Sequence, residues 1–288
     1  MRPYPQFGRV LALDPQQGKS NYRSLQASFL KRFGGKGILS VAYTWSKLMS
    51  NTDSVTAFLD EGGIFGGSIQ DNDNLAGEYS LSSYDIPQNL TIGYGVDLPF
   101  GRGKSFMGDS HGVLNGVIGG WRVNGITTLR SGVPIALAQT FAGSALSQLG
   151  GGTGYFGNQG LWMRPNVVPG CDKSAPGSRE YRATHGWFNT ACFQSVNTAT
   201  TVAFGDEPRV DPSMRQDTMD NWDFSIAKSN AITEKVNLMF TAEFFNLFNH
   251  VRFADPGIST DSAFGPFGIV TSQANIPRQI QFGLRLAF

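Results

Sequence analysis

One short stretch of the chain has the spacing of a phosphate-binding loop. Residues 152–157, Gly-Thr-Gly-Tyr-Phe-Gly, match the pattern G-x-G-x-x-G, in which the glycines let a backbone approach a pyrophosphate. That chemistry requires a strand before the glycines and a helix after them, and neither pattern is present. The sequence therefore favours a glycine-rich loop over a dinucleotide site.

Clustered acidic residues are a second candidate, because carboxylate and amide oxygens bind Ca²⁺. Residues 71–74, Asp-Asn-Asp-Asn, lack the glycine and the terminal glutamate of an EF-hand loop, so a solvated loop is favoured. Asp206, Glu207 and Asp211 receive the same interpretation.

The three histidines, His111, His185 and His250, lie far apart and lack the spacing of metal ligands. The chain has no G-x-S-x-G elbow and no H-E-x-x-H motif. The sequence thus predicts no catalytic, cofactor-binding or metal-binding residue and indicates that the chain is not an enzyme.

The two cysteines, Cys171 and Cys192, lie in one loop-like region. In an oxidising compartment such a pair predicts a disulfide. Two separate free thiols are the alternative.

Composition excludes several classes of protein. The chain has 288 residues, 16% of them charged, and a formal net charge of +1, so it lacks the basic excess of a nucleic-acid-binding protein. No apolar run is long enough for a transmembrane helix. Met1 is not followed by the apolar segment of a signal peptide, so we expect a C-terminal piece of a longer precursor.

Alternation of apolar and polar residues with a period of two is the dominant pattern. It is clearest at the carboxyl terminus, where the apolar positions are Ile280, Phe282, Leu284, Leu286 and Phe288. A strand of this kind has one apolar and one polar face. An outer-membrane β-barrel needs such strands, because one face meets lipid and the other the lumen. We interpret these five residues as the C-terminal assembly signal for the barrel-assembly machinery.

The same alternation predicts further strands at residues 21–33, 39–46, 90–98, 121–130, 222–226 and 236–244, with a weak first strand at 8–14. Most approach the ~9–11 residues that a tilted strand needs to cross a bilayer. The predicted fold is all-β: an antiparallel transmembrane β-barrel segment of about eight strands, a partial barrel with long extracellular loops.

The lengths of the connections predict an orientation. The turns at 34–37 and 233–235 are short, whereas the connections 50–88, 131–218 and 249–277 are long. Outer-membrane barrels have short periplasmic turns and long external loops, so we expect a periplasmic carboxyl terminus. Residues 99–120 form a longer periplasmic connection than expected.

Two sets of side chains follow from these strands. Aromatic residues near strand ends suit interfacial girdles better than a sandwich core: Tyr43, Trp45, Trp121, Trp222, Phe248 and Phe288. Polar residues on the opposite face are candidates for lining a ligand path in the lumen: Arg32, Arg122, Arg130, Glu243 and Arg285. Mutual pairing that satisfies a polar interior is the favoured alternative for the second set.

Several motifs resemble the C-terminal barrel of Oar-like TonB-dependent receptors. They span nearly the whole chain: Asn-Tyr-Arg-Ser-Leu-Gln at 21–26, Tyr-Thr-Trp-Ser-Lys at 43–47, Asp-Leu-Pro-Phe-Gly-Arg-Gly-Lys at 97–104, Gly-Gly-Trp-Arg-Val-Asn-Gly at 119–125, Trp-Phe-Asn-Thr at 187–190 and Phe-Phe-Asn-Leu-Phe-Asn-His at 244–250. The resemblance implies a barrel of about 22 strands with an N-terminal plug. It also implies uptake of a bulky ligand, driven through TonB.

The chain departs from that family because it lacks the plug and most of the strands. We therefore expect residues 1–288 to be the C-terminal part of a receptor barrel that does not transport alone. The expected partners are outer-membrane lipid, the TonB complex through the missing plug, and an unknown ligand; no nucleic acid is expected. The alternatives are a stand-alone small barrel and an adhesin-like binding module that displays long surface loops.

Overall fold

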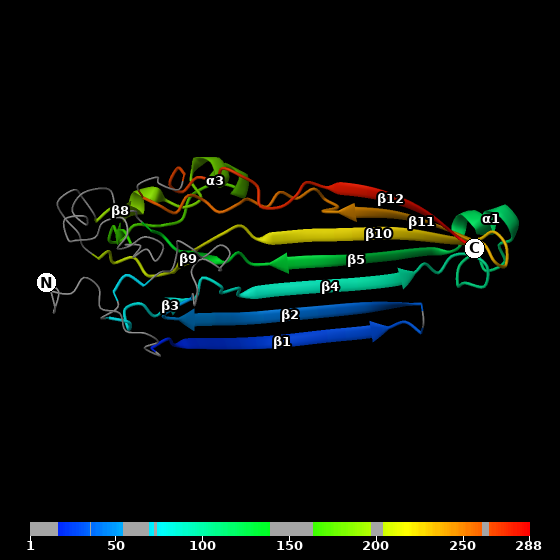
Figure 1. Ribbon diagram of the computed structural model, residues 1–288, viewed down its shortest axis with the longest axis horizontal. Coiled ribbons are helices and arrows are strands. Elements are labelled where there is room, and N and C mark those ends of the chain that lie inside the picture. Colours follow the sequence, from blue (N-terminus) through cyan, green and yellow to red (C-terminus); the bar gives the residue numbers. More distant parts are fainter. Residues whose placement is uncertain are drawn as a thin grey trace.

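The computed structural model describes residues 17–34, 36–53, 69–71, 74–138, 164–196, 204–260 and 265–288. Its main feature is an antiparallel sheet of long strands (Figure 1). In sheet order these are β1 (Ser20–Arg32), β2 (Gly37–Ser50), β4 (Gln88–Asp97), β5 (Trp121–Arg130), β10 (Met219–Ala231), β11 (Asn237–Phe245) and β12 (Gln279–Ala287). The short β3 (Ser80–Leu81) pairs with β2 and completes an 8-stranded sheet. The predicted all-β, antiparallel fold is confirmed, and the weak strand at 8–14 lies outside the described residues.

The pairing register places the predicted apolar residues on one face of the sheet. Phe29 of β1 lies beside Val41 of β2, which lies beside Ile92 of β4. Ile92 in turn lies beside Thr127 of β5, and Thr127 beside Trp222 of β10. Neighbouring rows continue the same face onto β11 and β12. Because successive side chains alternate, the intervening residues form a second, mainly polar face.

The apolar face is uncovered in the described part of the chain. Phe282 and Leu284 of β12 are 69% and 72% exposed. The other two sheets among the described residues have two short strands each and lie beyond one end of the long strands (Figure 1). The alternative in which the aromatic residues on this face fill the core of a sandwich is therefore wrong.

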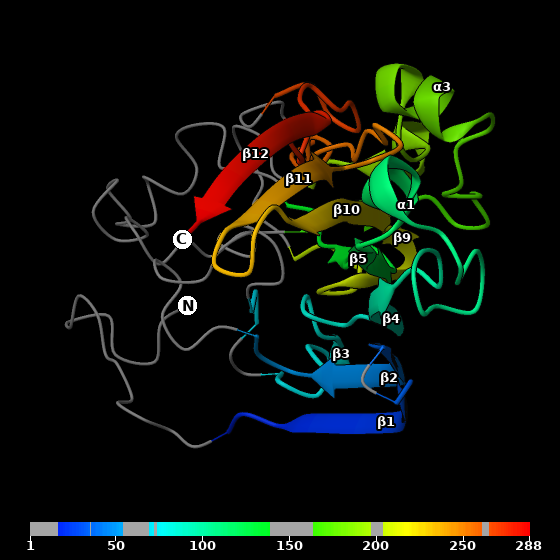
Figure 2. The same cartoon turned by 90° about the vertical axis from the view of Figure 1, so that its right-hand side faces the viewer.

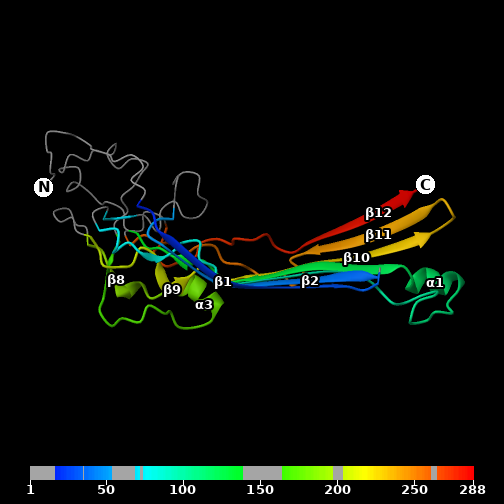
Figure 3. The same cartoon turned by 90° about the horizontal axis from the view of Figure 1, so that it is seen from below.

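The sheet is strongly curved. Seen from one end, it forms an open arc, with helix α1 (Gly112–Ile118) on its convex side (Figure 2). The view from below shows β12 bending away from the central strands and α1 lying just beyond their ends (Figure 3). The edges are β1 and β12, which run in the same direction because direction alternates along the order of the long strands. The described barrel wall is therefore not closed.

Short and long connections lie at opposite ends of the strands (Figure 1). The end with the carboxyl terminus carries the turns 33–36 and 232–236 and the connection 98–120, which contains α1. The three long connections, after β2, β5 and β11, lie at the other end, as their lengths predicted. In the described segments, no helix is long and apolar enough to cross a membrane.

The described residues of the three long connections form a layer that we call the cap. It comprises residues 51–53, 69–71, 74–87, 131–138, 164–196, 204–218, 246–260 and 265–278. Besides β3 it holds β6 (Pro134–Ile135), β7 (Asn166–Val167), β8 (Phe193–Gln194), β9 (Asp211–Arg215), α3 (Arg179–His185) and the 3-10 helix η1 (Thr190–Cys192). The connection predicted over 131–218 is indeed long, but the sequence did not predict the short strands and helices that its described residues contain. These elements are too short to produce a periodic signal in the sequence.

Candidate functional site

An apolar core holds the cap together. Its buried residues are Ile135, Leu137, Ala183, Trp187, Phe188, Cys192, Phe193 and Met214. The ring of Phe267, from the third long connection, meets those of Phe188 and Phe193 edge to face, with centroids 5.3 and 6.1 Å away. The Trp187 indole donates a 2.7 Å hydrogen bond to the Arg215 carbonyl. Since these residues come from two connections, the core fixes one against the other.

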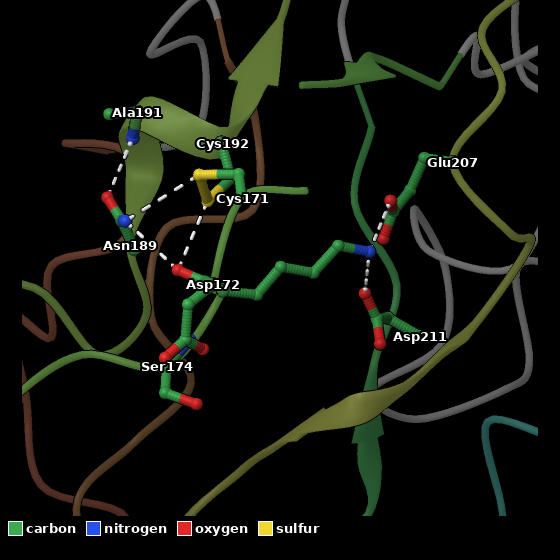
Figure 4. Close-up of a disulfide and its surroundings, with 9 residues drawn as sticks. Cys171, Asp172, Ser174, Asn189, Ala191, Cys192, Glu207 and Asp211 are labelled. Carbon is green, nitrogen blue, oxygen red and sulfur yellow. Dashed lines mark hydrogen bonds and ion pairs between the residues drawn. A yellow bond between two sulfur atoms is a disulfide. The ribbon is translucent and has the colours of Figure 1, made fainter. Parts of the chain in front are cut away.

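A disulfide between Cys171 and Cys192 borders this core, with a Cα–Cα distance of 5.5 Å (Figure 4). The Asn189 side chain lies beside it. Its Nδ2 donates to the Asp172 carbonyl at 3.0 Å, and its Oδ1 accepts from the Ala191 amide at 3.2 Å (Figure 4). The covalent bond and these hydrogen bonds pin the segment before α3 to η1.

Lys173 bridges two buried carboxyl groups (Figure 4). Its Nζ lies 2.8 Å from Glu207 Oε2 and 2.5 Å from Asp211 Oδ2. Both acids are 1% exposed, so the prediction that they are solvated was wrong. Asp206, the third member of that predicted cluster, binds the Val167 amide at 2.7 Å in an exposed position. Glu207 and Asp211 can be buried because the Lys173 ammonium lies between them and offsets the cost of removing two carboxyl groups from water.

Glu207, Asp211 and Lys173 shift one another's pKa values. Burial raises the pKa of Glu207 to about 8, the Asp211 carboxyl adds to the rise, and Lys173 opposes it. Burial alone would raise the pKa of Asp211, but hydrogen bonds from Glu207, Lys173 and Ser213 lower it. Burial opposes the charge on Lys173, yet its bonds to Asp211 and Glu207 raise its pKa. At neutral pH the cluster therefore holds a protonated Glu207, an ionised Asp211 and a charged Lys173.

The first and second long connections meet through three ion pairs in which the first always supplies the acid and the second the arginine. The pairs are Asp53–Arg209, Glu78–Arg164 and Asp85–Arg215. The Glu78–Arg164 pair is two-pronged, with distances of 2.5 and 3.1 Å. Arg215 Nη2 lies 2.8 Å from Asp85 Oδ2. Sequence reasoning named none of these six residues.

Arg209 is the centre of this contact and is 0% exposed. Its guanidinium binds Asp53, the Ser50 carbonyl at 2.7 Å, the Glu78 carbonyl at 3.0 Å and the Leu81 carbonyl at 3.3 Å. A buried guanidinium is stable only when its donors are satisfied. Here it ties the cap end of β2, together with β3, to the segment that leads into β9.

A fourth charged contact joins the second and third connections. Arg179 of α3 pairs with Asp217 at 3.2 Å and donates to the Val251 carbonyl at 3.0 Å. Asp217 also accepts from the Phe253 amide at 2.7 Å, and Arg179 lies over the Phe253 ring. The cap is therefore one interlocked unit built from all three long connections. A platform of this kind can present a fixed binding surface.

The five candidates for lumen-facing residues all lie on the polar face of the sheet, but they form no single cluster. Arg122 pairs with Asp97 of the neighbouring strand at 3.1 Å. Arg32 and Glu243 lie in one cross-strand row, yet β2, β4, β5 and β10 separate β1 from β11. Arg130 lies at the cap end of β5, and Arg285 beside Met239 on β11. They line one face rather than one site.

The remaining predicted positions do not converge either. His111 precedes α1, His185 lies in α3, and His250 Nδ1 lies 3.0 Å from Asp220 Oδ2. No group of acids, histidines or cysteines in the described ranges could hold a metal ion. The glycine-rich stretch 152–157 and residues 72–73 lie outside the described residues.

The apolar residues predicted to form the assembly signal occupy one face of β12. Leu284 lies beside Phe240 and Leu286 beside Leu238, so this face extends the apolar face of β11. Phe288 follows the strand and is 98% exposed. An uncovered apolar wall of this extent suits a hydrocarbon environment and would be unfavourable in water.

Comparison with known proteins gives the same answer as the geometry. No curated protein and no solved structure matches the chain significantly. The family model described as "Outer membrane beta barrel domain" matches residues 1–281, which is nearly the whole chain. Together with the open antiparallel wall and its apolar face, this match shows that the chain is an outer-membrane protein that belongs to the outer membrane beta barrel domain family.

Proposed function

We propose that the chain is the C-terminal part of the barrel of a TonB-dependent receptor that takes up a bulky ligand. The observation that carries this proposal is the open wall with parallel edges. Because β1 and β12 run in the same direction, they cannot join as an antiparallel pair, so closure requires at least one strand beyond the described sheet. The motifs at 97–104 and 244–250, which resemble such receptors, support a large ring over a small one.

In this proposal the cap is external and takes part in ligand capture, while the carboxyl terminus is periplasmic. The hollow beside Tyr181 and His185 has a volume of about 190 Å³, which is small for a bulky ligand. The cap therefore acts as a rigid rim, and the ligand passes along the polar face that carries Arg32, Arg122 and Glu243. Uptake depends on the TonB complex acting on a plug, and assembly depends on the barrel-assembly machinery reading β12.

Gel mobility tests the ring size. The purified 288-residue chain, folded in detergent, is compared with and without boiling. A receptor segment gives no compact, heat-modifiable band, because its edges stay open. A compact band that unfolds on boiling would instead support a self-closed small barrel and overturn the proposal.

Surface labelling of intact cells tests the orientation. Glu180→Cys in the cap and Glu234→Cys in the turn before β11 replace exposed residues at opposite ends of the strands. A membrane-impermeant maleimide is expected to label only the first variant. Labelling of the second variant alone would reverse the proposed orientation.

A further inference from the structure

The connection between β4 and β5 displays apolar side chains at the end opposite the cap. Val113, Leu114 and Val117 of α1 are 85%, 51% and 61% exposed. The preceding turn adds Phe100 and Phe106, whose rings lie 5.6 Å apart and are also exposed. A soluble connection gains nothing by exposing such a patch, so it marks an interaction surface.

Asn115 and Ser110 turn their side chains toward the backbone of this connection. Asn115 Oδ1 accepts a 2.7 Å hydrogen bond from the Arg102 amide, and Ser110 Oγ lies 3.4 Å from the same oxygen. Asn115 therefore anchors α1 to its own turn, while the stripe at 113, 114 and 117 points away. The exposure of the stripe is thus built into the local fold.

Two side chains fasten α1 to the apolar side of the barrel wall. Trp121 and Lys228 are cross-strand neighbours, and they lie on the same apolar face as the neighbouring pair Val123 and Ile226. Trp121 Nε1 donates to the Val117 carbonyl at 2.9 Å. Lys228 Nζ donates to the carbonyls of Val117 at 3.0 Å and Gly119 at 2.7 Å, and it lies over the Trp121 ring. These contacts agree with the place of α1 on the convex side of the sheet (Figure 2).

Trp121 and Lys228 also indicate where α1 lies along the barrel axis. Tryptophan and lysine are the side chains that membrane proteins place at the boundary between hydrocarbon and headgroups. Trp121 is the first residue of β5, so α1 lies where the wall leaves the hydrocarbon. Lys104 lines a hollow at this end of the wall with Trp121 and Lys228, and the Asp97–Arg122 ion pair lines it too, so the hollow carries three cations and one carboxylate.

We propose that α1 and the turn at residues 100–107 form an interfacial anchor, embedded in the headgroup zone of the leaflet at the carboxyl-terminal end of the strands. The occupant of the patch is phospholipid, because the patch continues the lipid-facing wall and its cations complement phosphate. The anchor fixes the depth of β4, β5 and β10 in the membrane. The proposal rests on the barrel fold and not on the identity of the ligand.

Site-directed spin labelling tests the anchor. Both native cysteines form the disulfide, so an introduced cysteine is the only thiol that a nitroxide reagent labels. Val113→Cys and Val117→Cys probe the stripe, and Asp109→Cys is the matched exposed control in the same connection. The full chain is inserted into vesicles of phosphatidylethanolamine and phosphatidylglycerol. Accessibility to oxygen, which partitions into lipid, is then compared with accessibility to a water-soluble nickel complex.

Labels at 113 and 117 are expected to show an oxygen-to-nickel ratio several-fold above that at 109. Equal ratios at the three positions would place α1 in water and overturn the proposal. Low accessibility to both reagents at 113 and 117 would also overturn it, because that result means that protein covers the patch.

Discussion

Arg164 and Glu78 form a two-pronged ion pair inside the cap, with Nη1–Oε2 and Nη2–Oε1 distances of 2.5 and 3.1 Å. Both side chains are almost fully buried. Replacing Arg164 by alanine leaves the Glu78 carboxylate without its cation, so we expect the cap to lose about 3–5 kcal/mol of free energy of unfolding. Hydrogen exchange of the amides at 74–87 and 164–196 measures this loss.

The matched control removes both charges together. Arg164→Met with Glu78→Leu keeps apolar volume and leaves no buried ion, so most of the protection is expected to return. Amide protection in β4 and β5 should not change in either variant. Wild-type protection of the cap in the Arg164→Ala variant would contradict the structural role of the pair.

The cluster of Lys173, Glu207 and Asp211 predicts that the cap weakens as pH rises. The pKa of Glu207 is about 8 in the folded cap, above its ordinary value of 4.5. Its contribution to stability is therefore fully present below pH 4.5 and is lost as pH rises through about 8. Protease resistance of the cap should fall between these limits. Glu207→Gln should flatten the profile, whereas Asp206→Asn should leave it unchanged.

The disulfide predicts a redox effect confined to the cap. Replacing Cys171 and Cys192 together by serine is expected to cost the cap about 3 kcal/mol, because the open chain gains conformational freedom. Limited proteolysis within residues 172–191 should accelerate. A reductant should accelerate cleavage of the wild type in the same way and have no effect on the double variant. Equal cleavage rates in all samples would show that the noncovalent core alone fixes this segment.

The sheet could be predicted from the sequence because its signal is local. Leu284 and Arg285 point to opposite faces by alternation alone, and the same alternation assigns a face to every long strand. Contacts within the cap have no such periodicity. Glu78 and Arg164 are 86 positions apart, and nothing between them fixes their meeting.

One feature of the sequence does point to the ion pairs. Residues 51–88 contain Asp53, Glu78 and Asp85 among other acids but no lysine or arginine. A connection of one charge sign needs cations from elsewhere if it packs, and arginine is suited to two-pronged pairing with carboxylates. That complementarity predicts contact between the first and second connections, although it does not identify which arginine meets which acid.

The terminal strand offers a direct test of which face meets lipid. Leu284 and Gln281 are both exposed residues of β12, but they lie on opposite faces. Leu284→Arg places a charge against hydrocarbon and should lower the stability of the inserted state by about 2–4 kcal/mol. Gln281→Arg places the same charge opposite Glu243 on the polar face, so its effect should be small or stabilising. Urea titration of vesicle-inserted protein measures both. Because neither substitution removes a buried contact, equal losses would contradict the assignment of the faces, and a larger loss at Gln281 would reverse it.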